Sequence, residues 1–282
     1  MTTTQPIKTL FANDIHRRIE EVIKVDQNDE EILRDEINEY VVTDAIRSHY
    51  TGIYDAYRET PNKPHEGIAI WVSGFFGSGK SSFAKMLGLS ISNRKIAGES
   101  AAERFGRRTG DKKLQVLLKA IAEKIPTHAV IFDVSTDRGI KSGNQTLTEI
   151  MYRLFLQSLG YSKDLDLSEL EIALEGSGQL EKFTSQYSKE FSKAWDEDKG
   201  LVAFSLGRAS KVMHVLEPAT YPQADSWVRG VKDKADISPG KLAERATMLM
   251  KRRRPGQSLI FVVDEVGQFV ARDVQKMLDL QA

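Results

Sequence analysis

The sequence predicts an α/β protein built on a parallel sheet, and three short apolar runs are the main observations behind this prediction. They cover residues 67–73, 128–133 and 259–265, and they are rich in β-branched and aromatic side chains. Near-continuous apolar strands are typical of parallel sheets that are covered by helices on both faces. Long stretches with helical periodicity separate the runs, as expected for an α/β fold.

Four segments are expected along the 282 residues. Residues 1–60 form an N-terminal helical extension, in which Thr43 caps a helix with an aromatic face. Residues 61–160 form the first part of the core, and residues 161–257 form a long helical insertion without a comparable strand. Residues 258–282 hold the third strand and a following helix. A partial sheet of three strands leaves an exposed edge, which favours association.

Composition excludes several functional classes. The chain has 40 basic and 40 acidic residues, so no global positive field argues for nucleic-acid binding. It has no cysteine, which excludes disulfides, thiolate catalysis and cysteine-bound zinc. The five histidines show no metal-binding spacing. No apolar run is long enough for a membrane span and no signal peptide is evident, so we expect a cytoplasmic protein without membrane contact.

A phosphate-binding loop follows the first apolar run. The chain there reads Gly74-Phe75-Phe76-Gly77-Ser78-Gly79-Lys80-Ser81, a full G-x-x-x-x-G-K-[ST] motif between a predicted strand and a predicted helix. Backbone N–H groups of such a loop and the positive end of the helix dipole bind polyphosphate. We expect Lys80 to contact the β- and γ-phosphates and Ser81 to bind Mg²⁺, with nucleotide contacts reaching Ser82.

The third apolar run ends in Asp264-Glu265, which has the form of a Walker B strand. Asp264 is the expected Mg²⁺ carboxylate, and Glu265 is the expected base that orients water toward the γ-phosphate. The plainer alternative is an acidic helix cap after a buried strand. Asp133 is a rival metal ligand, because it also ends a predicted strand, but Val134 follows it where an acid would be needed.

A glutamate next to the Walker B aspartate, with another strand between the two motifs in sequence, favours the additional-strand catalytic-glutamate (ASCE) ATPases, which include the AAA+ machines. The expected fold is therefore an incomplete P-loop NTPase sheet of the ASCE/AAA+ class. Two basic stretches stay ambiguous. Arg252–Arg254 are interpreted as a helix end, a phosphate-backbone contact or an arginine finger. The role of the basic residues in Arg104–Lys113 is left open in the same way.

Several stretches resemble one protein family. They are Phe11-Ala12-Asn13-Asp14-Ile15, Arg18-Ile19, Glu39-Tyr40-Val41-Val42-Thr43, Trp71-Val72-Ser73 with the phosphate loop, Phe132-Asp133, and Phe261-Val262-Val263-Asp264-Glu265. Together they resemble the BrxC (PglY-like) ATPases of BREX bacteriophage-exclusion systems, over essentially the whole chain. The resemblance implies a large cytoplasmic protein with an AAA+ region similar to origin-recognition ATPases, acting in phage defence beside a methyltransferase and other BREX proteins.

The resulting hypothesis is an ATP hydrolase with ATP and Mg²⁺ as cofactors, which drives a defence complex on DNA. Because the resemblance implies a much longer protein, the present chain is expected to be its N-terminal part, with an incomplete AAA+ core. Hydrolysis is expected in the full-length protein, in a homo-oligomer where a neighbouring subunit supplies an arginine, and the activity of the present chain alone is left open. The first alternative is a non-hydrolysing module whose assembly is switched by nucleotide. The second is a nucleic-acid-binding protein that uses the basic helix end at Arg252–Arg254.

Overall fold

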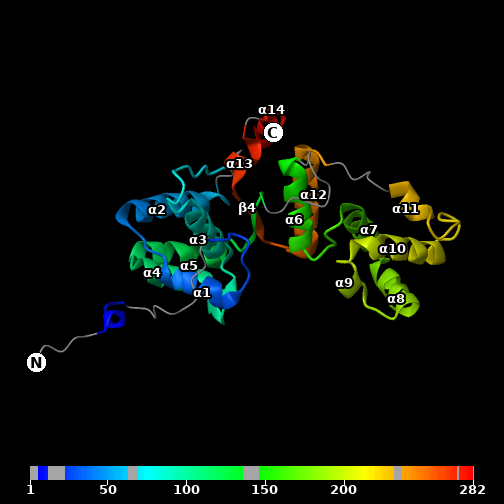
Figure 1. The fold of residues 1–282 in the computed structure, drawn as a ribbon, viewed down its shortest axis with the longest axis horizontal. Coiled ribbons are helices and arrows are strands. Elements are labelled where there is room, and N and C mark those ends of the chain that lie inside the picture. Colours follow the sequence, from blue (N-terminus) through cyan, green and yellow to red (C-terminus); the bar gives the residue numbers. More distant parts are fainter. Residues whose placement is uncertain are drawn as a thin grey trace, which may run out of the picture.

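The computed structural model describes residues 6–11, 23–62, 69–135, 146–231, 237–271 and 273–281. It is a mixed α/β structure, mostly helical, with a small parallel sheet near its middle (Figure 1). A short 3-10 helix, η1 (Ile7–Leu10), comes first. The helix expected from Ile15, Ile19 and Val22 lies outside the described residues. None of the described helices is both long and apolar enough to span a membrane.

The parallel sheet consists of β3 (Thr127–Asp133) and β4 (Ser258–Asp264), which confirms the second and third predicted strands. Their register pairs the first residues of the two strands with each other and also the last, Asp133 with Asp264. Side chains alternate between the two faces of the sheet, as they do in any strand. Ile131 and Ile260 pack toward one helical layer, whereas Phe132 and Phe261 belong to the other.

One face of the sheet is covered by the helix that follows the phosphate loop and by its neighbours. The elements on this side are α1 (Glu30–Glu39), α2 (Asp44–Glu59), α3 (Lys80–Ser92), the hairpin β1 (Lys95–Ile96) with β2 (Glu99–Ser100), α4 (Ala101–Thr109) and α5 (Lys112–Lys124). The Thr43 hydroxyl accepts the Ile46 N–H, so the predicted cap of α2 is confirmed. Buried Tyr50 and Tyr54 lie in the same core, as expected for the aromatic face of α2.

The helix α3 packs closely on the sheet at Gly88. A Cβ atom built there would lie 2.8 Å from Ile131 Cδ1 and 2.9 Å from Val262 Cγ2. These distances are below ordinary van der Waals contact, so glycine allows the helix to approach both strands at once. The phosphate-loop helix is therefore seated directly on β3 and β4.

The other face of the sheet is covered by α6 (Leu147–Ser158), α12 (Pro239–Arg253) and α13 (Val266–Val270). The last helix, α14 (Val274–Gln281), packs against α6 and α13. The Ser238 hydroxyl accepts the Lys241 N–H, which confirms the cap predicted for α12. Although α12 lies within the segment predicted as an insertion, its apolar face packs in the core beside the sheet. We expected a single final helix, and this prediction is wrong. The helix is interrupted at Ala271, where φ is +39°.

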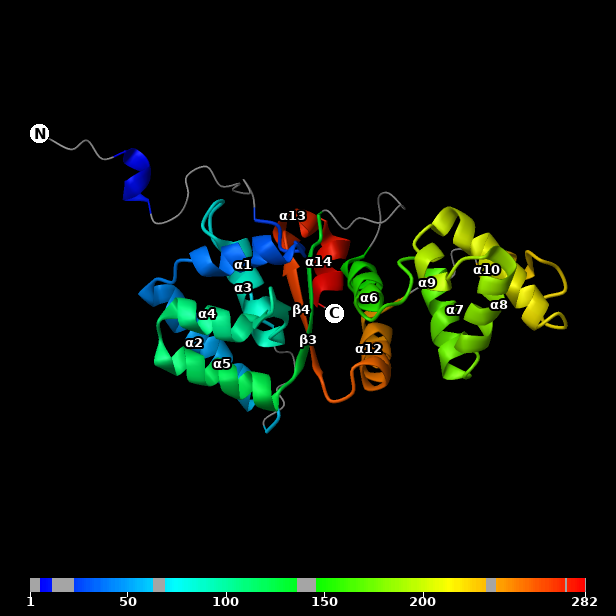
Figure 2. The ribbon, with the colours of Figure 1, turned by 90° about the horizontal axis from the view of Figure 1, so that it is seen from below.

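A separate helical domain lies at one side of the sheet (Figures 1 and 2). It comprises α7 (Leu165–Gly176), α8 (Leu180–Phe191), α9 (Trp195–Asp198), α10 (Val202–Leu216) and α11 (Ser226–Val231). Its own hydrophobic core includes the buried side chains of Tyr187, Trp195 and Trp227. The expectation of short helices without a strand holds for the described part of this segment.

The strand expected over 67–73 is wrong for its described part, because residues 69–73 form no strand. The side chains of Ile70 and Trp71 are 51% and 65% exposed. A strand needs a hydrogen-bonding neighbour, and in the described structure β3 and β4 pair only with each other. Without a third strand beside it, the apolar run before the phosphate loop stays exposed.

Candidate nucleotide site

The phosphate loop has the backbone that its glycines predict. Gly77 and Gly79 have φ values of +76° and +86°, in the left-handed region where a side chain is strained. Gly79 is the N-cap of α3 and supplies no side-chain cap, so the first N–H groups of the helix are not covered by one. Uncapped N–H groups at a helix start are suited to binding an anion.

The chain turns closely at Gly74, beside the side chain of Ser78. A Cβ atom at that position would lie 2.7 Å from Ser78 Oγ. The loop is tightened further by the Ser78 N–H, which donates to the Phe75 carbonyl at 3.2 Å. The side chains of Phe75 and Phe76 are 92% and 98% exposed, so they take no part in the core.

The ammonium group of Lys80 folds back over the loop. Its Nζ donates to the Phe75 carbonyl oxygen at 2.8 Å. Because Lys80 is the first residue of α3, this contact keeps its charge beside the uncapped N–H groups of the helix. The ammonium group that is predicted to bind phosphate is thus held over its own loop by a backbone carbonyl oxygen.

The predicted acids lie at the carboxyl end of the sheet. Asp264 is the last residue of β4, and its register partner is Asp133 on β3. Asp264 Oδ1 accepts the N–H of Glu265 at 3.0 Å, and Asp133 Oδ1 accepts the N–H of Ser135 at 2.7 Å. The two carboxylates that sequence analysis treated as rivals are thus neighbours in the fold.

Glu265 occupies a strained position just after β4. Its φ is +58°, which is uncommon for a residue with a side chain, and it begins α13. Its carboxylate accepts a hydrogen bond from Gln268 Nε2 at 2.6 Å. Sequence analysis missed Gln268; the signal was its spacing of three residues from Glu265 at a helix start, where two side chains meet.

Contacts along α2 show how α3 is oriented relative to the sheet. Tyr54 hydrogen-bonds Ser90 near the end of α3, and Tyr57, one turn further along α2, hydrogen-bonds Thr127 at the start of β3. The end of α3 therefore lies toward the start of β3. The beginning of α3, with the phosphate loop, lies toward the opposite end, where β4 ends (Figure 2).

Element lengths agree with this placement. Gly88 contacts Val262, and Ser81 is seven residues before it, roughly 10 Å along the helix axis. Asp264 is two residues beyond Val262, roughly 7 Å along the strand. Both motifs thus extend to the same end of the sheet, although Ser81 and Asp264 make no hydrogen bond with each other.

The basic stretches are largely engaged within the chain. Arg252 and Arg253 form ion pairs of 2.9 and 2.7 Å with Glu175 on α7, and Arg253 also lies over the ring of Tyr161. They join α12 to the helical domain, which favours a structural role over an arginine finger or phosphate contact. In the other stretch, Arg104 and Arg107 both pair with Glu99.

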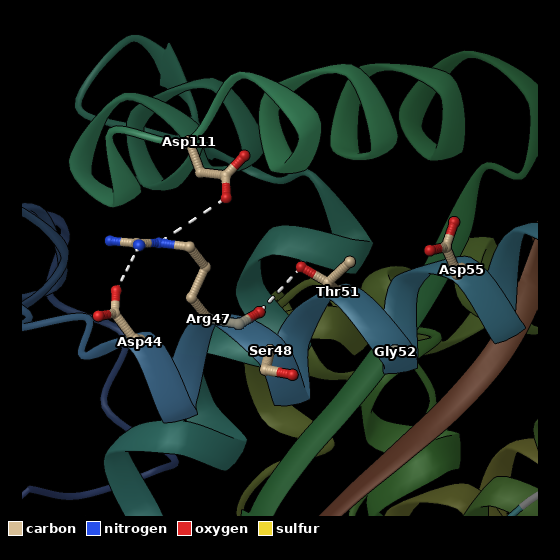
Figure 3. Close-up of a pocket in the computed structure, with 7 residues that line it drawn as sticks. All are labelled: Asp44, Arg47, Ser48, Thr51, Gly52, Asp55 and Asp111. Carbon is tan, nitrogen blue, oxygen red and sulfur yellow. Dashed lines mark hydrogen bonds and ion pairs between the residues drawn. The ribbon is translucent and has the colours of Figure 1, made fainter.

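A cavity of about 430 Å³ lies elsewhere, between α2 and the start of α5 (Figure 3). Its lining residues are Asp44, Arg47, Ser48, Thr51, Gly52, Asp55 and Asp111, none of which belongs to the phosphate loop. Arg47 reaches from Asp44, at 2.6 Å, toward Asp111, at 3.7 Å. The arginine offsets one of the three aspartate charges in the lining, and sequence analysis did not predict this cavity.

No cluster of three or more metal-ligating side chains occurs in the described ranges. A Mg²⁺ ion does not need one, because it is usually held by one or two protein oxygens together with water and phosphate. Ser81 and Asp264 are of the right chemical type for that limited role.

No family model matches the chain, and no solved structure gives a significant match.

Proposed function

We propose that this chain is the ATP-binding part of an AAA+-type ATPase, with nucleotide on Gly74–Ser82 and Mg²⁺ on Ser81 and Asp264. The observation that carries the proposal is the shared end of the sheet. The approach of Gly88 to β3 and β4 and the contacts of Tyr54 and Tyr57 direct the start of α3 toward the carboxyl end of β4, where Asp264 and Glu265 follow. Ligands of open α/β sheets bind beyond the carboxyl ends of the strands.

Phosphate binding follows from the loop geometry. Backbone N–H groups around Gly77 and Gly79 and at the start of α3 would donate to phosphate oxygens. Lys80 would release the Phe75 carbonyl and turn toward the β- and γ-phosphates. Bound Mg²⁺ supplies charge neutralisation of the polyphosphate, and Ser81, Asp264 and the adjacent Asp133 are the oxygens placed to hold it or its water shell.

Hydrolysis would use Glu265. A carboxylate that follows the metal ligand by one residue can accept a proton from a water aligned with the γ-phosphate. We propose that turnover belongs to the full-length protein as a homo-oligomer, with an arginine supplied by a neighbouring subunit. The engagement of Arg252 and Arg253 with Glu175 supports a source outside this chain.

The additional-strand class is inferred from the strand that lies between the two motifs in sequence, and β3 (Thr127–Asp133) occupies that position. The run at 69–73 pairs with neither β3 nor β4 in the described structure. We propose that further strands complete the P-loop NTPase sheet in the full-length protein.

The cellular role rests on the resemblance to BrxC-like ATPases. It supports a cytoplasmic ATPase that works with other BREX proteins and DNA in phage defence. The rival function is a nucleotide-switched assembly module without hydrolysis. The unpaired apolar run at 69–73 favours that rival for the present chain, because an exposed edge is available for association.

Binding and turnover separate the two functions. A fluorescent ATP analogue should bind this chain in the presence of Mg²⁺ and should bind Lys80→Ala far more weakly. The full-length protein should hydrolyse ATP, and Glu265→Gln should abolish turnover while retaining binding. Binding without turnover in the full-length wild type would favour the assembly module, and an absence of Mg²⁺-dependent binding would contradict both functions.

A further inference from the structure

A buried lysine on the phosphate-loop helix anchors a segment from the N-terminal extension. Lys85, five residues after Lys80 on α3, is completely buried. Its Nζ donates to the Lys24 carbonyl at 2.6 Å and forms an ion pair with Glu36 on α1 at 2.5 Å. Burial lowers the pKa of Lys85, and Glu36 opposes that shift.

The segment 24–40, which we name the strap, is held at further points around α3. Asn28 Oδ1 accepts from Arg94, just after α3, at 3.1 Å, and Glu30 Oε2 accepts the Ala97 N–H at 2.8 Å. The Tyr40 carbonyl accepts from Arg108 at 2.7 Å. Three apolar strap residues are buried, namely Val25, Leu33 and Ile37. The strap therefore packs against α3 and forms hydrogen bonds with the elements that follow it.

The contacts between the strap and α3 affect the phosphate loop, because few other contacts in the described structure hold that loop in place. Residues 69–73 before it have no strand partner in the described structure, and the loop itself is exposed. The position of the loop is thus set by α3, and α3 is fixed by the sheet, α2 and the strap. The side chain of Lys85 lies roughly 7.5 Å along the helix from Lys80, by residue count.

We propose that the strap regulates the phosphate site: nucleotide on the loop tightens residues 24–40 against α3, and release of the strap weakens nucleotide binding. The inference rests on the proposed function, since it names a regulator of the same site. Coupling between two sites is reciprocal, so the factor by which nucleotide stabilises the strap equals the factor by which the strap strengthens nucleotide binding.

Glu30 and Glu31 offer a matched pair of variants. Both lie in the first turn of α1, but only Glu30 accepts from Ala97 on the β1–β2 hairpin. Glu30→Ala combined with Asn28→Ala removes two exposed contacts and leaves the buried Lys85–Glu36 pair intact. Glu31→Ala is the control for the loss of an acid from the same helix turn.

The test is hydrogen exchange of the strap amides in this chain, with and without Mg²⁺ and a non-hydrolysable ATP analogue, alongside the affinity of that analogue. We expect the analogue to slow exchange over 24–40 by at least about fivefold, the lower end of usual couplings. The Asn28/Glu30 double variant should lose most of that effect and weaken binding by the same factor, whereas Glu31→Ala should match the wild type.

The outcomes distinguish the two proposals. Analogue binding that leaves strap exchange unchanged would overturn the regulatory inference and leave the nucleotide site intact. Equal affinity in the double variant and the control would overturn it as well. If the wild type binds no analogue, the proposed function fails, and the inference fails with it.

Discussion

The helical domain and the phosphate-loop side of the core differ in how far their polar groups are hydrogen-bonded within the protein. In the helical domain, buried Asp198 accepts from Tyr187 and Arg208, and buried Glu171 accepts from Trp195 at 2.7 Å. Its charges are satisfied internally, as buried charges must be in a stable core.

The phosphate-loop side leaves comparable groups open. The start of α3 has no side-chain cap, and two phenylalanines are almost fully exposed. Among the described residues, the Lys80 ammonium donates only to a carbonyl of its own loop. Trp71 is exposed as well, in contrast to the buried Trp195. The difference is that the described polar groups of the helical domain are satisfied within it, whereas those of the phosphate-loop side stay accessible to solvent.

The largest expected effect on stability comes from replacing each of the two tryptophans, Trp195 and Trp71, by alanine. Trp195→Ala should lower the free energy of unfolding of the helical domain by about 3–5 kcal/mol, because it removes a buried ring packed edge-on against Phe183 and Tyr187. Trp71→Ala should change stability by less than about 0.5 kcal/mol. Denaturant unfolding monitored by circular dichroism measures both changes in stability. Equal losses of stability in the two variants would contradict the difference between the two regions.

Next in size is the loss of Lys80. Lys80→Ala should weaken Mg²⁺-dependent ATP binding by about 100-fold, because it removes the charge placed for the β- and γ-phosphates. Stability should hardly change, since the only hydrogen bond that the Lys80 ammonium makes in the described structure is to Phe75. Fluorescence titration gives the affinity, with Lys119→Ala, on the exposed face of α5, as the control. Similar affinities for the two variants would contradict the site.

A smaller effect is expected where α3 meets the sheet. Gly88→Ala should cost about 1–3 kcal/mol, because the added methyl group would overlap Ile131 and Val262. Gly52→Ala on α2 is the matched control: a Cβ there meets nothing within 4 Å, so alanine should stabilise the helix by up to about 1 kcal/mol. Thermal melts should move in opposite directions, and a shared direction would contradict the close seating of α3.

The smallest effect is a pH dependence at His128. Burial, assisted by the charge of Arg254, lowers the pKa of His128 below its usual 6.5. Between the two values the unfolded chain binds more protons, so stability falls as the pH drops from about 6.5 through the lowered pKa. His128→Gln should flatten this acid-side loss in unfolding curves taken between pH 7.5 and 5. An unchanged slope would show that His128 is not the group responsible.

The sequence predicted the elements whose signals are local. The caps at Thr43 and Ser238, two of the three strands and the glycine turns of the phosphate loop follow from patterns that span a few residues. The helix α4 was missed because its charged residues mask an apolar face, which becomes clear only when Phe105 is seen packed in the core.

Other features depend on contacts far apart in the chain. No local pattern indicates that Glu175 engages Arg252 and Arg253, or that Asp133 lies beside Asp264. The run at 68–72 has the composition of a buried strand, yet the described part of it is exposed, because strand formation depends on a neighbouring strand. The residue types of the candidate site could thus be named from the sequence, whereas their neighbours could not.

The central claim is that the phosphate loop and the end of β4 share one Mg²⁺ ion. The most direct measurement is the Mg²⁺ dependence of ATP binding in Asp264→Asn, with Asp133→Asn as the matched variant. We predict that Asp264→Asn loses most of the gain in affinity that Mg²⁺ gives the wild type, and that Asp133→Asn retains more of it. A full Mg²⁺ effect in Asp264→Asn would contradict the account.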